Sequence, residues 1–258
     1  MKLVYFALDY LGIDPRKAFT NFKGLFWYIK DISIFRKQYA NTKQEFRVRY
    51  IPILTDKHDT SGKAWGQYFY QDLYVANRIF VDNPTRHIDI GSRVDGFVAH
   101  VAAFRKIEVF DIRPMAGKVK NIEFVQADLM QFDPALAECT DSLSCLHTIE
   151  HFGLGRYNDP IDVDGHRKGL DTMYKLLKPG GRFYFSTQIG PLRIDFNSHR
   201  IFSIQYLLDY FGDKYTIERF AYINDADEFF ADVPLTPELI ATNAGCKMGC
   251  GIFVLVKK

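Results

Sequence analysis

The sequence predicts a doubly wound α/β fold with a mixed seven-stranded sheet and an N-terminal helical extension. The first observation is a strand–helix–strand unit at residues 86–111, in which two short apolar runs flank a segment with helical spacing. The second is a series of further apolar runs bounded by turn residues, at 122–127, 142–146, 182–187, 215–223 and 251–256. The third is that helix-compatible segments alternate with some of these runs, at 165–177 and 204–210, which favours parallel strands.

The strand–helix–strand unit has the pattern of a nucleoside site. Gly91 follows its first strand, where a turn close to a ligand needs a residue that adopts positive φ. Asp111 ends its second strand, where one carboxylate can bind both hydroxyls of a ribose. Arg93 stands where a dinucleotide fingerprint has a glycine, so a ligand without a pyrophosphate is favoured. Asp89 precedes the glycine and suits an ammonium group on that ligand.

These residues resemble the first motif of class I S-adenosylmethionine-dependent methyltransferases, which reads acid-x-Gly-x-Gly-x-Gly. Asp89 and Gly91 match it, whereas Arg93 and Asp95 stand where further glycines are expected. The resemblance implies a Rossmann-like methyltransferase fold, with S-adenosyl-L-methionine as cofactor and S-adenosyl-L-homocysteine as product.

Later segments extend the resemblance to residues 86–258. The Ala-Asp-Leu sequence at 127–129 and the Leu-Lys-Pro-Gly-Gly sequence at 177–181 are typical of the family, and the last two apolar runs resemble its closing hairpin. Three other segments resemble a bacterial family of unknown function that is often associated with surface-polysaccharide gene clusters. They are DIGSRVDGFVAH, TIEHFGLGRYNDPID and FNSHR.

The resemblance implies a set of cofactor contacts at the carboxyl ends of the strands. Asp128 would accept a hydrogen bond from the adenine amino group, and the backbone N–H of Leu129 would donate to a ring nitrogen. Capping of a helix or turn is the alternative role for Asp128. The expected cofactor residues are Asp89, Gly91, Ser92, Arg93, Asp111, Ile112, Asp128, Leu129 and Leu146.

Histidines near the end of the fourth strand are the catalytic candidates. His147 resembles in position the catalytic histidine of many small-molecule O-methyltransferases, and an imidazole with an ordinary pKa near ~6.5 can accept a proton at neutral pH. His151 and His199 are rivals for this role. If a helical turn begins at His147, then His147, Glu150 and His151 share one face, which gives a metal-dependent O-methyltransferase as an alternative. This imidazole-rich set suits Mg²⁺ poorly, and no resident metal is predicted.

The segment 188–203 is predicted to be a polar and basic loop at the carboxyl edge of the sheet. Side chains of this kind suit a small polar or anionic acceptor, such as a sugar or nucleotide-sugar in surface glycan biosynthesis. The candidate acceptor-binding residues are Glu150, Arg193, Asn197 and Arg200. A catalytically silent binding protein of the same fold is a further alternative, which the presence of Asp111 and Asp128 disfavours.

Composition limits the partners. A net charge of +2 over 258 residues gives no bulk electrostatic case for nucleic-acid binding. The N-terminal sequence has no small-residue cleavage site, and no apolar stretch is long enough to span a bilayer, so a cytoplasmic location is expected. The four cysteines form no C-x-x-C pair and are expected to be free thiols.

Residues 1–83 are predicted to be an N-terminal extension and residues 84–258 the methyltransferase domain, with Asn83-Pro84 at the boundary. Two amphipathic helices are expected in the extension, at 24–39 and 66–80. A helical cap that packs on the sheet is favoured. The alternatives are a lid, a homodimer surface or a membrane contact through Phe26-Trp27-Tyr28.

Overall fold

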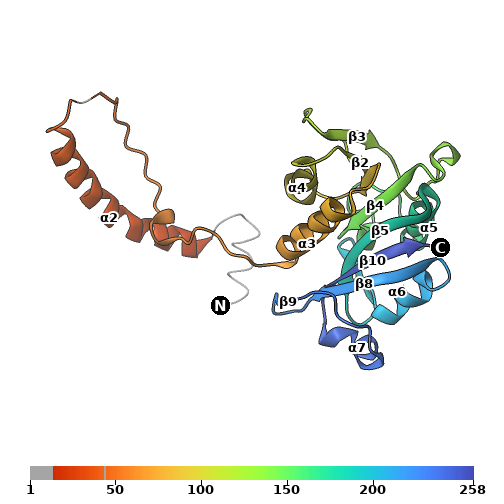
Figure 1. The fold of residues 1–258 in the computed structure, drawn as a ribbon. Coiled ribbons are helices and arrows are strands. Elements are labelled where there is room, and N and C mark those ends of the chain that lie inside the picture. The colour runs from red at the N-terminus through yellow and green to blue at the C-terminus, as the bar shows by residue number, and fades with distance from the viewer. Residues whose placement is uncertain (1–13, 44) are drawn as a thin grey trace. The chain divides into compact units, whose positions relative to one another are not determined.

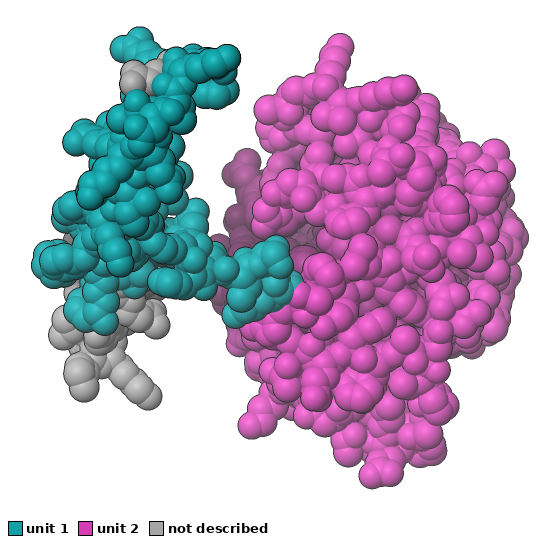
Figure 2. Space-filling model, turned by 60° about the vertical axis from the view of Figure 1, so that its left-hand side comes forward, with its two compact units in different colours: residues 1–63 teal, residues 64–258 magenta. Residues whose placement is uncertain are grey.

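The computed structural model describes residues 14–43 and 45–258, so the N-terminal start in which no cleavage site was found lies outside the described residues. The chain divides into two compact units, Met1–Lys63 and Ala64–Lys258 (Figures 1 and 2). No helix in the described part of the chain is long and apolar enough to cross a membrane. The four cysteines form no disulfide.

The described part of the first unit consists of helix α2 (Pro15–Tyr39), an irregular segment and a single turn of 3₁₀ helix, η1 (Asp56–His58). The helix begins earlier than the sequence suggested. Residues 47–54 are extended and form no strand. They return along the helix, as Figure 1 shows. Gly24 permits this close approach, since a Cβ at this position would lie 2.7 Å from the carbonyl oxygen of Leu54.

The second unit is built on an eight-stranded mixed sheet in the order β3-β2-β1-β4-β5-β10-β8-β9 (Figure 1). Strands β1 to β5 pair in parallel, whereas β10 is antiparallel to both β5 and β8, which is the closing hairpin expected from the sequence. The eighth strand is a two-residue edge strand that pairs with β8, too short to be recognised by alternation. The strands are β1 (His87–Ile90), β2 (Ile107–Asp111), β3 (Ile122–Gln126), β4 (Thr140–Leu146), β5 (Leu177–Ile189), β8 (Tyr215–Ile223), β9 (Phe229–Phe230) and β10 (Gly249–Lys257).

Helices cover both faces of this sheet, as in a doubly wound fold. One face is covered by α3 (Gln67–Asp82), the π-helical turn η2 (Val94–Val98) and α4 (Ala99–Ala102). The other is covered by α5 (Gly165–Leu176) and α6 (Ile204–Phe211). The remaining short helical elements are η3 (Pro134–Leu136), η4 (Ile149–His151), α7 (Pro237–Ala241) and η5 (Asn243–Gly245).

Helix α3 belongs to the second unit, which differs from the boundary expected at residue 83. Val75, Ala76 and Ile79 are buried against Phe97 and Val101 on one face of the sheet. The spacing of apolar residues predicted the helix, but it did not show that the apolar side of the helix packs on the sheet of the second unit. Along the chain, the boundary between the two compact units therefore falls after Lys63, in the polar segment before α3.

The segment expected to be an open polar loop forms a small antiparallel hairpin of β6 (Arg193–Asp195) and β7 (His199–Ile201). Asn197 occupies its turn with φ of 62°. Phe202, immediately after the hairpin, forms a bridge to Ile189 at the end of β5. The hairpin is therefore held against the sheet by its second strand.

Candidate functional site

A cavity of about 280 Å³ lies at the carboxyl ends of the parallel strands. Open α/β sheets bind their ligands at this edge. Tyr68 of α3 contributes to the lining. Much of the lining comes from the ends of four strands and the turns that follow them: Gly91, Ser92 and Arg93 at β1, Asp111, Ile112 and Arg113 at β2, Ala127, Asp128 and Leu129 at β3, and His147, Thr148 and His151 at β4. Every expected cofactor residue except Asp89 lines this cavity.

Gly91 has the positive φ that the sequence predicted, at 70°. Its N–H donates a hydrogen bond to the carbonyl of Phe110, 2.9 Å away, which ties the turn to β2. A Cβ at this position would lie 2.4 Å from the Cγ2 of Thr148. The glycine is therefore required both by backbone conformation and by close packing against the turn after β4.

Asp89 is fully buried beneath this turn and does not line the cavity. Its carboxylate accepts hydrogen bonds from the backbone N–H and the hydroxyl of Ser92 and from the hydroxyl of Ser144. Burial raises the pKa of Asp89 to about 7, although the bonds from Ser144 and Ser92 oppose this shift. The structure thus places Asp89 as a support of the turn, where we had expected contact with a ligand ammonium group.

Asp111 ends β2 and faces the cavity, but its carboxylate has an internal partner. Arg113 donates from Nε to Oδ1 at 3.0 Å and from its terminal nitrogen to Oδ2 at 2.6 Å. The Arg113 guanidinium also lies over the Tyr157 ring, 4.5 Å from its centroid. Sequence reasoning missed both residues. Arg113 carried a signal in the sequence, since an arginine two positions after Asp111 can reach back to its carboxylate.

Arg93 and Asp128 also line the cavity. Arg93 is exposed and paired with Asp95, at 2.8 Å. Asp128 accepts a hydrogen bond from the backbone N–H of Met130 and another from the side chain of Gln131, so it caps the turn after β3. This capping was the alternative role considered for Asp128.

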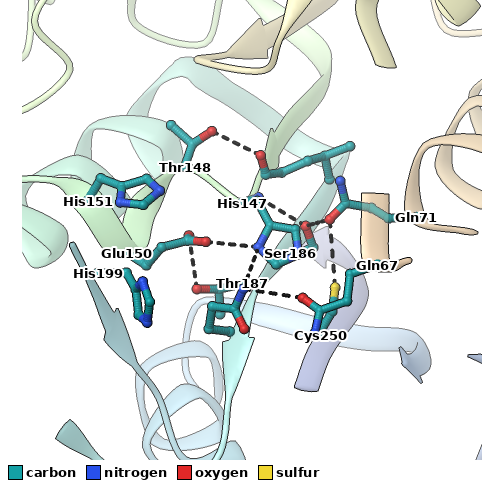
Figure 3. A network of polar contacts seen from close by, with 12 residues as sticks. Gln67, Gln71, His147, Thr148, Glu150, His151, Ser186, Thr187, His199 and Cys250 are labelled. Atoms are coloured by element: carbon teal, nitrogen blue, oxygen red, sulfur yellow. Dashed lines mark hydrogen bonds and ion pairs between the residues drawn. The ribbon is translucent and has the colours of Figure 1, made fainter. Parts of the chain in front are cut away.

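A buried polar network lies behind the His147 side of the cavity (Figure 3). His147 Nδ1 lies 2.9 Å from Glu150 Oε1, and the other carboxylate oxygen accepts a hydrogen bond from Thr187. The backbone N–H of His147 donates to Ser186, whose hydroxyl donates to Gln71 of α3. His147 Nε2 is buried and has no hydrogen-bond partner among the described residues.

The His147–Glu150 contact forms a buried ion pair, with both side chains 1% exposed. Burial alone would lower the pKa of His147, but Cys250 and the Glu150 carboxylate raise it well above its ordinary value. Burial would likewise raise the pKa of Glu150, and the hydrogen bond from His147 lowers it. The raised pKa of His147 favours the imidazolium form, which disfavours the role of neutral base that we had expected for this residue.

The helical turn at His147 that the metal-dependent alternative requires is absent, because this residue has φ of 48° and η4 starts two residues later. His151 Nδ1 donates instead to the carbonyl oxygen of Ser198, 2.6 Å away. Figure 3 shows His151 beside the network with no contact drawn to it. In the described part of the chain, no group of three or more His, Cys, Asp or Glu side chains is arranged to hold a metal ion.

His151 has the properties that His147 lacks. Both histidines line the cavity, but only for His151 does burial lower the pKa, which favours the neutral ring. Because Nδ1 donates to a carbonyl, the neutral tautomer leaves the lone pair on Nε2 free to accept a proton.

None of the expected acceptor-binding residues lines the cavity. Glu150 is held inside the network described above. Arg200 is buried and donates to the backbone carbonyls of Phe152 and Val163, so it supports the loop after β4. Arg193 donates to the carbonyl of Lys247, and His199 contacts Ser198 and Asp195 within the hairpin. Asn197 is exposed at the hairpin turn.

Comparison with solved structures shows the fold. The N-methyltransferase NodS from Bradyrhizobium japonicum WM9, in complex with S-adenosyl-L-homocysteine, is 15% identical, with a TM-score of 0.51, over 80% of this chain and 91% of NodS. A 1,6-didemethyltoxoflavin N1-methyltransferase from Burkholderia thailandensis is 14% identical, with a TM-score of 0.50, over 89% of each chain. The chain has the Rossmann-like methyltransferase fold. The [4+2]-cyclase SpnF matches this fold equally, with a TM-score of 0.52 and 14% identity over 78% of this chain and 85% of SpnF.

A family model described as a Caenorhabditis protein of unknown function, DUF268, matches residues 105–217, which is less than half of the chain. No curated protein matches the chain significantly. Because the Rossmann-like methyltransferase fold also occurs in a protein named as a cyclase, the chemistry must be argued from the site.

Proposed function

We propose that residues 64–258 bind S-adenosyl-L-methionine in the cavity and transfer its methyl group to a small polar molecule. The observation that carries this proposal is the Asp111 carboxylate, which lies at the cavity beside the positive-φ turn of Gly91. The NodS and didemethyltoxoflavin methyltransferase structures, both described with S-adenosylhomocysteine, support it.

The lining fits this cofactor. Asp111 would bind the ribose hydroxyls, and the apolar side chains of Ile112 and Leu129, which also line the cavity, would pack against the adenine ring. Asp128 keeps a carboxylate at the cavity while it caps its turn. When bound, the cofactor supplies a methyl group activated by the sulfonium. The protein must then align the acceptor in line with that group and, for a hydroxyl acceptor, take up its proton.

More specifically, we propose that the methyl group is transferred to an oxygen atom of a sugar or nucleotide-sugar, in cytoplasmic steps of surface glycan biosynthesis. The sequence resemblance supports this acceptor class. The neutral imidazole of His151 at the cavity supports proton removal from a hydroxyl. Because the named neighbours include N-methyltransferases, an assay should offer both hydroxyl and amine acceptors.

Binding of S-adenosylhomocysteine tests the proposal. We expect the full-length protein to bind it more tightly than NAD, and Asp111→Ala to weaken binding by about 1.5 to 3 kcal/mol, the range for hydrogen bonds to a charged group. Isothermal titration calorimetry measures both. The control is Glu123→Ala, which removes an exposed carboxylate of β3 that pairs with Lys106. Unchanged affinity in Asp111→Ala would contradict the assignment, and binding without transfer to any acceptor would indicate a silent binding protein.

Arg113 leads to a second prediction, in which the variant binds S-adenosylhomocysteine more tightly than the wild type. The guanidinium competes with the ribose hydroxyls for the Asp111 carboxylate, so ligand binding is expected to weaken this partly exposed ion pair. Such pairs contribute about 0 to 1 kcal/mol, and Arg113→Ala is therefore expected to tighten S-adenosylhomocysteine binding up to about fivefold. Lys106→Ala, which breaks the exposed Lys106–Glu123 pair, is the matched control. Weaker binding by Arg113→Ala would show that this arginine contacts the ligand itself.

A further inference from the structure

Helix α2 has two different faces. One face packs against the returning segment, where Gly24 meets Leu54 and the Lys57 ammonium lies 2.5 Å from Asp31 and 4.4 Å from the Trp27 ring centroid. These contacts occupy the side of the helix that carries Gly24, Trp27 and Asp31.

The other face carries large apolar side chains that the first unit leaves exposed. Five of them recur at helical spacing and fall within about 120° of arc at 100° per residue. They are Phe19, Phe22, Leu25, Phe26 and Ile29, with exposed fractions of 58, 63, 43, 66 and 58%. We call these five residues the apolar stripe. Scattered exposed apolar residues are ordinary in proteins, whereas a contiguous helix face of this kind marks an interaction surface.

The charge around the stripe is strongly positive. Residues 14–63 contain eleven Lys and Arg against five Asp and Glu, a net charge of +6, whereas residues 64–258 contain 21 against 25, a net charge of −4. Lys23 and Lys30, one heptad apart, follow one edge of the stripe, and the Lys23 ammonium lies 4.4 Å from the Phe19 ring centroid. The basic charge of the chain is thus concentrated in the unit that carries the stripe.

We propose that α2 binds the surface of an anionic membrane, with the apolar stripe inserted at the level of the acyl chains and Lys23 and Lys30 among the lipid phosphates. Aromatic and aliphatic side chains on one face with lysines beside them are the composition of interfacial helices. Anionic lipid attracts such lysines. Pairing of the stripe with the same stripe of a second copy is less favoured, because it would bring the two first units, each with a net charge of +6, against each other.

Co-sedimentation of the full-length protein with vesicles tests this proposal. Binding to phosphatidylcholine vesicles that contain phosphatidylserine is expected to exceed binding to pure phosphatidylcholine vesicles, and to fall as salt is raised. The variant Phe22→Ser/Phe26→Ser/Ile29→Ser removes the centre of the stripe, and Lys23→Glu/Lys30→Glu reverses the charge beside it. Each is expected to lower the bound fraction about tenfold or more.

The matched controls lie in the second unit. Ile161→Ser/Val163→Ser removes two side chains that are 68 and 72% exposed, and Lys118→Glu/Lys120→Glu reverses two exposed charges; both are expected to bind vesicles like the wild type. Circular dichroism should show unchanged helix content in the charge-reversed variant. Equal binding to both kinds of vesicle, or full binding by the stripe variant, would overturn the proposal. So would a stable dimer in light scattering that the stripe variant alone dissociates.

Discussion

Replacing His151 by alanine is expected to lower the rate of methyl transfer about 10²- to 10⁴-fold, the usual contribution of a positioned general base. His151 lines the cavity, and its Nδ1–H is fixed by the Ser198 carbonyl, which leaves Nε2 to accept the proton of a hydroxyl acceptor. Binding of S-adenosylhomocysteine should change little, because the cofactor contacts proposed above come from other strands. Transfer of a labelled methyl group to the acceptor that the wild type uses, followed in single turnovers, measures the loss.

The pH dependence of the rate gives an independent check. Burial lowers the pKa of His151, so the ring stays neutral to a pH below the ordinary histidine value of ~6.5. The rate should therefore hold its plateau as the pH falls through 6.5 and decline only at lower pH. A decline centred above ~6.5 would instead indicate a group with a raised pKa, as in His147.

His199→Ala is the control for His151, because His199 lies in the β6–β7 hairpin and does not line the cavity. It should leave the rate within a few-fold of wild type. A near-normal rate in His151→Ala would reject proton abstraction by this residue. Alignment of an already acidic acceptor would then be the contribution of the protein.

The sequence predicted the sheet well because its strands are short, apolar and bounded by turn residues. It also predicted the positive φ of Gly91 and the cavity-facing position of Asp111, since both follow from where a strand ends. The position of a strand end does not determine which way the side chains near it point, so these orientations could not be predicted from the sequence. Asp89 turns inward to Ser92 and Ser144, and this choice depends on a neighbouring strand.

The catalytic candidates show the same limit. Linear spacing placed His147, Glu150 and His151 on one helical face, but the left-handed backbone at His147 breaks that face. Spacing also does not reveal buried partners. Burial lowers the pKa of His151, whereas Cys250 and the Glu150 carboxylate raise the pKa of His147 against the effect of burial. Arg200 was expected to bind an anion, and it is instead satisfied by backbone carbonyls of a loop that the sequence leaves undefined.

Removal of the Glu150 carboxylate is expected to cause the largest loss of stability. In Glu150→Ala the buried His147 ring would have to release its proton or stay charged without a partner, and Thr187 would lose its acceptor. Breaking a buried pair in this way costs about 3 to 5 kcal/mol of the free energy of unfolding. Urea denaturation of wild type and variant near pH 6 measures the difference.

The difference in the free energy of unfolding between wild type and Glu150→Ala should depend on pH in a way that follows from the two pKa shifts. The pKa of Glu150 is lowered in the folded protein, so its contribution is present above the unfolded value of ~4.3 and is lost as the pH falls through the folded pKa. The pKa of His147 is raised, so its contribution is present below ~6.5 and is lost as the pH rises through the folded pKa. The stability gap between wild type and Glu150→Ala should therefore be widest between about pH 4.3 and 6.5 and narrow on both sides.

Two further variants separate the pair from the rest of the network. Glu150→Gln keeps the shape and an acceptor oxygen but removes the charge, so it should be less destabilised than Glu150→Ala. In the double variant His147→Ala/Glu150→Ala no charge is left buried, and its loss should be smaller than the sum of the two single losses. Additive losses, together with a stability gap that does not vary with pH, would mean that His147 is neutral in the folded protein. In that case His147 could accept a proton, and the sequence-based prediction of His147 as the base would again be possible.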